Sequence, residues 1–148
     1  MERVQKYWIT VVSKDHAMRA VAGGFIQINH GKEAPLKRMS PNDYILIYSS
    51  KLSMEGDAKL QAFTAIGQVV DQHIYQHAMS DSFIPFRRNI KFYDCVEVPI
   101  APLIPNLDFI TNKQSWGYPF RFGFFEIEKA DFELISYRML GTDNSTKV

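Results

Sequence analysis

The sequence predicts an α+β fold in which a mixed, largely antiparallel sheet curls toward an open barrel and short helices pack outside it. The first observation is the order of segments, because several β-rich apolar runs follow one another with few helical crossovers between them. The second is length, since 148 residues suit one domain that buries roughly two-thirds of its unfolded surface. We therefore assign residues 1–148 to a single domain with a frayed polar tail from about residue 141.

The N-terminal segments predict a central strand followed by a short helix. Tyr7–Ser13 (YWITVVS) is apolar and rich in β-branched and aromatic residues, which favours a strand. Ser13 is placed to cap a helix that begins near Lys14, with Asp15 in a first turn that favours negative charge. Gly23–Gly24 ends this helix.

The stretch from Gly23 to Lys51 is the centre of the functional interpretation. A polar loop comes first, and Pro41–Asp43 then turns the chain into Tyr44–Tyr48, a run apolar on both faces that predicts a buried strand. The loop carries apolar, hydrogen-bonding and basic side chains in close succession: Phe25, Ile26, Gln27, Asn29, His30, Lys32, Lys37 and Arg38. Aromatic and amide groups beside cations suit a flat, polar, anionic ligand, of which nucleic acid is the obvious example.

The middle of the chain adds further strands. Leu60–Asp71 predicts a long strand in which Gly67 marks a bulge or a close approach. Gln72–Ser82 is ambiguous between an irregular loop and a short helix. Asn89–Tyr93 alternates as a strand does, and Val96–Val98 is a candidate continuation of it.

The last part of the chain predicts a short buried helix over Leu103–Ile110, a loop over Thr111–Pro119 and a strand over Phe120–Ile127. Ala130–Leu140 has an apolar face at helical spacing and predicts the final helix. We expect the core to consist of Trp8, Ile9, Ile45, Ile47, Phe63, Ile66, Phe124, Ile127, Phe132 and Ile135.

Composition and charge narrow the class of protein. Aromatic residues make up 14% of the chain, so some exposed rings are expected. The formal net charge is only +1, so attraction to phosphate has to come from local clusters of basic residues. The single cysteine, Cys95, fits a reducing cytoplasm, and no signal peptide or bilayer-spanning run is recognisable. We expect a cytoplasmic monomer that makes no membrane contact.

A series of short motifs, taken in chain order, resembles the EVE domain, a member of the PUA-like superfamily and a relative of the YTH readers of methylated RNA. The motifs are Tyr7–Ile9 (YWI), Ser13–His16 (SKDH), Gly24–Gln27 (GFIQ), His30–Lys32 (HGK), Pro35–Met39 (PLKRM), Gln61–Gly67 (QAFTAIG) and Phe120–Gly123 (FRFG). The resemblance runs from about Tyr7 to Met139. It implies a PUA-like barrel, a pocket that takes one modified nucleobase of RNA or DNA, no cofactor and no catalysis.

The resemblance also implies which residues hold the base. Ser13 and Lys14 resemble the YTH positions that hydrogen-bond a flipped base. Phe25 stands where YTH readers keep a cage tryptophan, and its smaller ring without an indole donor speaks against methyladenine as the ligand. The full set of expected base-binding residues is Ser13, Lys14, Gly24, Phe25, Ile26, Gln27, Tyr48, Ser49, Ser50, Phe83, Phe86 and Trp116.

Basic residues on the loops supply the expected phosphate contacts. Arg121, in the Phe-Arg-Phe-Gly motif, resembles a phosphate-contacting arginine, and we expect it to share one rim with Lys37 and Arg38 around a concavity that contains Phe25. The full set is Lys37, Arg38, Arg87, Arg88, Lys113 and Arg121. Any one of them alone is better explained as a solvated surface charge. Interleaved with exposed rings, the set fits nucleic acid better, although a packing role for Trp116 is as well supported as a stacking role.

Other chemistries find little support in the sequence. His73 and His77 have the spacing of two metal ligands on one helix face, but a zinc site usually needs three or four ligands and no further ligand pattern is present. Ser13–His16 contains Ser, Asp and His, yet helix capping explains Ser13 and Asp15 without catalysis. We therefore expect no enzyme. The alternative is a small enzyme or partner-binding protein that acts on a free nucleobase or nucleotide.

Overall fold

The computed structural model describes residues 4–141, in which a seven-stranded sheet forms the centre of the molecule. The strands are β1 (Tyr7–Val11), β2 (Phe25–Ile26), β3 (Tyr44–Lys51), β4 (Lys59–Gln76), β5 (Phe86–Phe92), β6 (Val98–Pro99) and β7 (Phe124–Ile127). They pair in the order β2-β5-β4-β3-β1-β7, with β6 joined separately to β4. Only β1 and β3 run parallel among the described pairs. The predicted α+β fold with a mixed, mostly antiparallel, curled sheet is confirmed.

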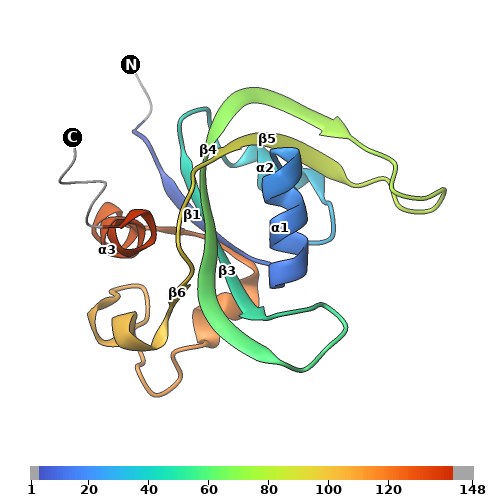
Figure 1. The fold of residues 1–148 in the computed structure, drawn as a ribbon. Coiled ribbons are helices and arrows are strands. Elements are labelled where there is room, and N and C mark those ends of the chain that lie inside the picture. Colours follow the sequence, from blue (N-terminus) through green and yellow to red (C-terminus); the bar gives the residue numbers. More distant parts are fainter. Residues whose placement is uncertain (1–3, 142–148) are drawn as a thin grey trace.

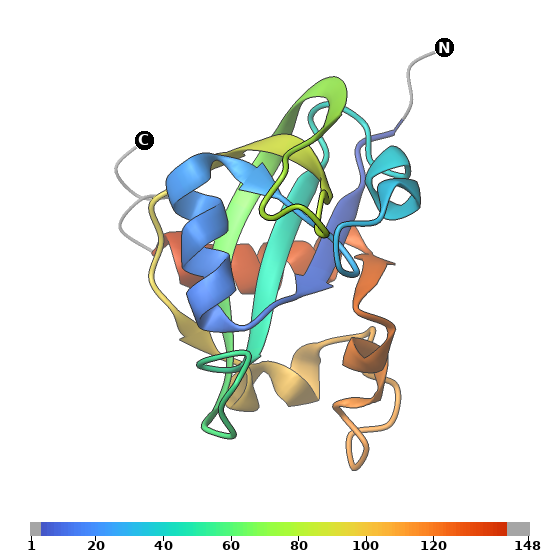
Figure 2. The same ribbon diagram turned by 90° about the vertical axis from the view of Figure 1, so that its right-hand side faces the viewer.

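The helices cover the sheet from both sides. They are α1 (Lys14–Gly23), α2 (Glu33–Lys37) and α3 (Lys129–Leu140), and two 3₁₀ helices, η1 (Ala101–Asn106) and η2 (Tyr118–Phe122), lie at one end of the sheet. α3 lies on one side of the sheet and α1 on the other, and the long strand β4 bends over α1 (Figure 1). The view turned by 90° looks onto the α1 side, with α3 behind the strands (Figure 2). Within residues 4–141, no helix is long and apolar enough to cross a bilayer.

The alternation of side chains along β1 divides the core between these two sides. Ile9 packs with Phe63, Phe132 and Ile135 in the larger cluster, which includes the α3 residues. Trp8, its neighbour, packs with Ile45 and Phe124 in a second cluster, against the chain around α2. Every residue predicted for the core is buried. That prediction is confirmed, and it shows that the strands were assigned their correct inward faces.

The β4–β5 hairpin is longer than the sequence predicts. β4 continues past Asp71 to Gln76 because Ile74, Tyr75 and Gln76 pair with Arg88, Arg87 and Phe86 of β5. A register irregularity between Val69 and Ile74 accommodates the bend. Gln72–Ser82 therefore contributes strand residues, and no helix forms there.

The segment before β7 is the other main difference. Phe120–Ile127 is not one strand, because Tyr118–Phe122 forms η2 and Gly123, at φ +75°, separates it from β7. Gly123 is able to hold this angle without a Cβ penalty. The helix expected over Leu103–Ile110 is the shorter η1, which ends at Asn106. The tail expected beyond residue 141 lies outside the described residues.

Candidate nucleic-acid interface

A cavity of about 570 Å³ opens on the α1 side of the sheet. Its walls come from α1, the chain that enters and leaves β2, and the loops that join β3 to β4 and β4 to β5. In Figure 2 these segments lie on the side that faces the viewer. Its lining residues are Val11, Val12, Ser13, His16, Arg19, Ala20, Phe25, Ile26, Gln27, Asn29, His30, Ile47, Ser50, Lys51, Met54, Met79, Phe83, Arg87, Phe120 and Gly123. Its size falls within the range typical of small-molecule sites, roughly 300–1,000 Å³.

The lining of this cavity combines aromatic rings with positive charge. Phe25, Phe83 and Phe120 supply the rings, and Arg19, Lys51 and Arg87 supply cations. None of the described residues that line it is an aspartate or glutamate. The cavity therefore favours an aromatic ligand that carries negative charge.

The guanidinium of Arg87 lies over the ring of Phe25. Its guanidinium carbon is 3.8 Å from the ring centroid, and its Nε donates a hydrogen bond of 2.7 Å to Oε1 of Gln27. The other end of the Phe25 ring packs close to Gly23, where an added Cβ would lie 2.6 Å from Cδ2 of the ring. Ring, guanidinium and amide thus hold one another in place, and the terminal nitrogens of Arg87 remain available as donors.

Ser13 and Asp15 form a short hydrogen-bonded pair at the start of α1. The buried Ser13 hydroxyl donates to Oδ1 of Asp15 at 2.6 Å, and the backbone N–H of His16 donates to the same oxygen at 2.9 Å. The bond from Ser13 is the main reason that the pKa of Asp15 is lowered. Ser13 occupies the N-cap position, but its side chain makes no capping bond, which corrects the capping role predicted from the sequence.

The chain between β2 and α2 is held in an unusual conformation where it borders the cavity. Asn29, His30 and Gly31 all have positive φ, at 49°, 63° and 82°. Gly31 approaches the β4–β5 loop closely, and its carbonyl accepts a 2.8 Å hydrogen bond from the backbone N–H of Phe86. The hydrogen bond between Gly31 and Phe86 fixes two cavity walls relative to each other. Left-handed backbone at non-glycine residues tends to occur at ligand-binding sites.

The structure brings together about half of the residues expected to hold a base. The expected residues that line the cavity are Ser13, Phe25, Ile26, Gln27, Ser50 and Phe83. Lys14 instead forms an ion pair of 2.8 Å with Glu97, and Gly24 ends α1 through a bond from its N–H to Ala20. Phe86 packs against the second core cluster. Trp116 packs against the larger cluster and meets Phe120 edge-on, so the structure favours its packing role.

Two of the expected base-binding residues are in the core. Tyr48 is 1% exposed, its ring stacks on Phe120 at 4.0 Å, and burial raises the pKa of its phenol to about 12. Ser49 is fully buried and shares a 2.8 Å hydrogen bond with the hydroxyl of Thr64. Neither residue is among those that line the cavity.

Arg88 is the main correction to the expected phosphate set. It is 2% exposed, and its guanidinium donates to the carbonyl oxygens of Leu36 at 2.7 Å, Met39 at 2.6 Å and Asp71 at 2.8 Å. These bonds tie α2 to β4, so Arg88 is structural and does not reach a ligand.

The other expected phosphate residues differ in their distance from the cavity. Arg87 lines it, and Arg121 lies between Phe120 and Gly123, which both line it. Lys37 pairs with Glu33 at 3.6 Å, and the guanidinium of Arg38 lies 5.1 Å from the Trp8 ring. Nζ of Lys113 donates to the Leu107 carbonyl at 2.7 Å. Lys37, Arg38, Lys113 and Arg121 itself are absent from the lining, so the predicted rim of Lys37, Arg38 and Arg121 around Phe25 is not found among its lining residues.

Several lining residues were not selected from the sequence. His16, Arg19 and Ala20 lie on one face of α1. Their i, i+3, i+4 spacing in the sequence, just after Ser13, indicates this shared face. Asn29 and His30 stand in the loop already singled out for its hydrogen-bonding side chains. Lys51 is the last residue of β3, and Met54 and Met79 come from the β3–β4 and β4–β5 loops; no sequence pattern marks these three residues.

His73 and His77, whose spacing suits two metal ligands only on a helix, do not lie on one. His73 lies in β4 and stacks on Tyr75 at 5.3 Å, and His77 follows the end of the strand. Across the described residues no group of three or more His, Cys, Asp or Glu side chains is arranged to hold a metal ion.

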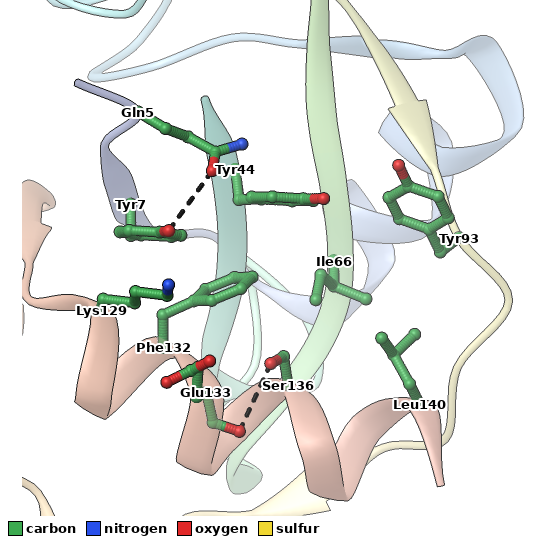
Figure 3. Close-up of a pocket in the computed structure, with 10 residues that line it drawn as sticks. All are labelled: Gln5, Tyr7, Tyr44, Ile66, Tyr93, Lys129, Phe132, Glu133, Ser136 and Leu140. Atoms are coloured by element: carbon green, nitrogen blue, oxygen red, sulfur yellow. Dashed lines mark hydrogen bonds between the residues drawn. The ribbon is translucent and has the colours of Figure 1, made fainter. Parts of the chain in front are cut away.

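A second cavity, of about 410 Å³, lies on the opposite side of the sheet, between α3 and strands β1, β3 and β4 (Figure 3). Tyr7, Tyr44 and Phe132 are packed against one another there, and the phenol of Tyr44 points toward Tyr93. Lys129 and Glu133 supply opposite charges at its mouth. None of the residues expected to bind a base or phosphate lines this cavity. We therefore place the candidate site on the α1 side.

A protein-family model described as "EVE domain" matches residues 6–137, which is most of the chain. The chain belongs to the EVE family. This confirms the family suggested by the sequence motifs, and the match includes all the elements that build the α1-side cavity.

Relatives of this EVE domain occur in bacteria of different genera. A UPF0310 protein of Bacillus licheniformis is 52% identical over 86% of this chain and 87% of its own length. Another, of Mycolicibacterium vanbaalenii, is 50% identical over 90% of this chain and 92% of its own length. The EVE domain is thus similar to whole small proteins rather than to a part of larger ones.

Solved structures support the fold. An NMR structure of a Rhodopseudomonas palustris protein aligns with a TM-score of 0.55 at 16% identity, covering 88% of this chain and 90% of the other. A hypothetical protein of Leishmania major aligns with a TM-score of 0.51 at 12% identity and 98% coverage of both chains. At these identities the likeness concerns the fold alone.

Proposed function

We propose that this EVE domain is a non-catalytic nucleic-acid-binding module that takes one modified base of RNA or DNA into the α1-side cavity. The observation that carries the proposal is the lining, where the rings of Phe25, Phe83 and Phe120 stand beside Arg19, Lys51 and Arg87 and no carboxylate is among the described lining residues. A nucleotide combines the two properties that such a lining selects, a flat π-system and negative charge.

The arrangement of Arg87 on Phe25 suggests how the base is held. A base that enters the cavity meets a guanidinium plane already aligned on an aromatic ring, and both guanidinium planes and rings stack on bases. Gln27, Asn29 and Ser13 place polar groups around the same space and are suited to the polar edge of the base. Leaving a nucleic-acid stack costs a few kcal/mol, and modified or single-stranded sites reduce this cost.

A binding role is favoured over catalysis by the state of the candidate nucleophile. The Ser13 hydroxyl donates a hydrogen bond to Asp15, whereas the nucleophile of a Ser-His-Asp triad donates its hydrogen bond to the histidine. We accordingly propose no enzymatic activity and no cofactor. A reader of cellular nucleic acid would work in the cytoplasm, which also suits the lone cysteine, Cys95.

A thermal-shift screen against modified nucleosides and matched modified and plain oligonucleotides tests the proposal, because a ligand that binds only the native state raises its stability. We expect at least one modified strand to shift the melting temperature more than its plain counterpart. A stabilising free nucleoside combined with no oligonucleotide binding would instead support the alternative, a protein that acts on a free base or nucleotide.

Salt dependence separates the same two alternatives. Phosphate contacts release counterions, so affinity for a strand should fall steeply as the salt concentration rises. In a plot of the logarithm of the binding constant against the logarithm of the salt concentration, each bound phosphate should add roughly one unit to the negative slope. Affinity for an uncharged nucleoside should barely change. A flat salt response with an oligonucleotide would contradict the proposed phosphate contacts.

A further inference from the structure

The outer face of η2 carries an exposed aromatic pair beside the cavity. Tyr118 is 57% exposed and Phe122 60% exposed, and their rings meet edge-to-face with centroids 5.5 Å apart. Neither residue was expected to bind a ligand, and neither lines the cavity. Large apolar side chains exposed side by side usually mark an interaction surface.

The same short helix supplies a cation to this pair. The guanidinium carbon of Arg121 is 5.8 Å from the centre of the Tyr118 ring, and Arg121 is exposed. Within residues 4–141 it forms no ion pair, so its charge is not neutralised by a neighbouring carboxylate. Exposed rings with an adjacent arginine are the combination by which proteins hold unpaired bases and their phosphates.

Tyr118, Arg121 and Phe122 adjoin two residues that line the cavity, Phe120 and Gly123. Phe120, between them in sequence, points inward, stacks on the core residue Tyr48 and lines the cavity, and Gly123 lines it as well. A strand with one base in the cavity therefore has the η2 surface within reach of its neighbouring nucleotide.

We propose that Tyr118, Arg121 and Phe122 form a stacking platform for the nucleotide next to the captured base. The platform selects single-stranded nucleic acid, because in a duplex the neighbouring base is stacked and paired and cannot reach the rings. It does not select sequence, since every base offers a π-face. This inference rests on the proposed function and specifies its substrate as an unpaired strand.

The test uses a fluorescein-labelled oligothymidylate of roughly ten nucleotides, a length that single-strand sites accommodate. Its binding is followed by fluorescence anisotropy with the full chain, as wild type and as Phe122→Ala, Phe122→Trp and Tyr137→Ala. Phe122→Ala should weaken binding about 5- to 100-fold, the effect of losing one stacked base. Phe122→Trp, which keeps a ring, should retain wild-type affinity to within about threefold. Tyr137→Ala removes an exposed ring from α3, on the other side of the sheet, and should leave the affinity for oligothymidylate unchanged.

Several results would overturn the platform. Unchanged affinity in Phe122→Ala would do so, as would equal affinity of the wild type for the same sequence in a duplex. Sedimentation that shows a dimer broken by Phe122→Ala, with oligothymidylate binding intact, would assign the rings to a second copy of the chain.

Failure of the platform and failure of the proposed function are distinguishable. If the proposed function holds without the platform, Arg87→Ala abolishes the rise in melting temperature that a modified nucleoside causes, and Phe122→Ala leaves the affinity for oligothymidylate unchanged. If the platform holds alone, Phe122→Ala weakens oligothymidylate binding while no modified base is preferred over its plain counterpart.

Discussion

Arg87 and Arg88 are neighbours in the sequence and have opposite environments in the structure. Successive residues of a strand point to opposite faces, so β5 directs Arg87 to the cavity and Arg88 into the protein beneath α2. The sequence predicts the alternation but not which arginine faces inward. That depends on the register of β5 against β4, which places Arg88 opposite Ile74. The same limit applies to Tyr48 and Ser49, whose burial follows from strands on both sides of β3.

The planar contact between Arg87 and Phe25 gives the first prediction. Arg87→Lys keeps the charge but loses both the guanidinium stack and the Nε bond to Gln27. We expect it to weaken binding of a modified oligonucleotide about tenfold, corresponding to about 1.4 kcal/mol, when measured by anisotropy titration. Arg138→Lys, on α3, is the matched control and should bind as the wild type does. Wild-type affinity in Arg87→Lys would show that only charge matters at this position.

Buried Tyr48 predicts a specific pH dependence. Its pKa is raised by burial to about 12, above its ordinary value of 10.0, so the folded state holds the phenolic proton more tightly than the unfolded state. The resulting stability is complete below pH 10 and is lost as pH rises from about 10 toward about 12. Denaturant unfolding at several alkaline pH values should show a steeper loss for the wild type than for Tyr48→Phe. Parallel curves would mean that Tyr48 ionises without unfolding the protein.

At the scale of elements, the sequence predicts the regular strands well and the connections less well. β1, β3 and the first part of β4 are apolar runs whose burial follows from their composition. The second half of β4 is polar, and only pairing with β5 makes it a strand. α2 and η2 are single short turns, too brief for a periodic pattern to identify. Of these less predictable elements only η2 supplies a described lining residue, Phe120; the lining residues that the sequence did not single out lie mainly on α1, at the end of β3 and in loops.

The contact between Gly31 and the β4–β5 loop gives an element-scale prediction. A Cβ at Gly31 would overlap Pro85, lying 2.7 Å from its Cα, and the residue has φ +82°. Gly31→Ala should therefore destabilise the fold by roughly 1–3 kcal/mol and weaken ligand binding, because the two walls move apart. Thermal unfolding and anisotropy titration measure the two effects. Gly56→Ala, whose Cβ would only touch Ser53 at 4.0 Å, should leave both unchanged.

Strand β4 gives a second prediction at this scale. Phe63 is fully buried in the larger core cluster and meets Tyr48 edge-on at 5.4 Å. Phe63→Ala should lower the free energy of unfolding by about 3–5 kcal/mol, enough to unfold a marginally stable domain. Urea denaturation provides the value. A loss within experimental error would be inconsistent with the packing described for β4.

At the scale of the whole molecule, the sheet separates two regions with different chemistry. The α3 side carries an aromatic cavity with both signs of charge at its mouth, and the α1 side carries the cationic cavity with the exposed η2 rings beside it. A net charge of only +1 is therefore compatible with nucleic-acid binding, because Arg19, Lys51 and Arg87 line the cavity beside its rings and no carboxylate is among the described lining residues. We propose that the cavity reads the base and that the residues around it hold the strand.

Parallel titrations of Phe25→Ala and Arg121→Ala against matched modified and plain strands test this division most directly. Phe25→Ala removes the ring on which Arg87 is stacked, so it should weaken binding of the modified strand far more than binding of the plain strand. Arg121→Ala should weaken both strands alike, because phosphate contacts do not read the base. If Phe25→Ala instead weakens both strands equally, the cavity does not read the base, and the surface is a general nucleic-acid contact.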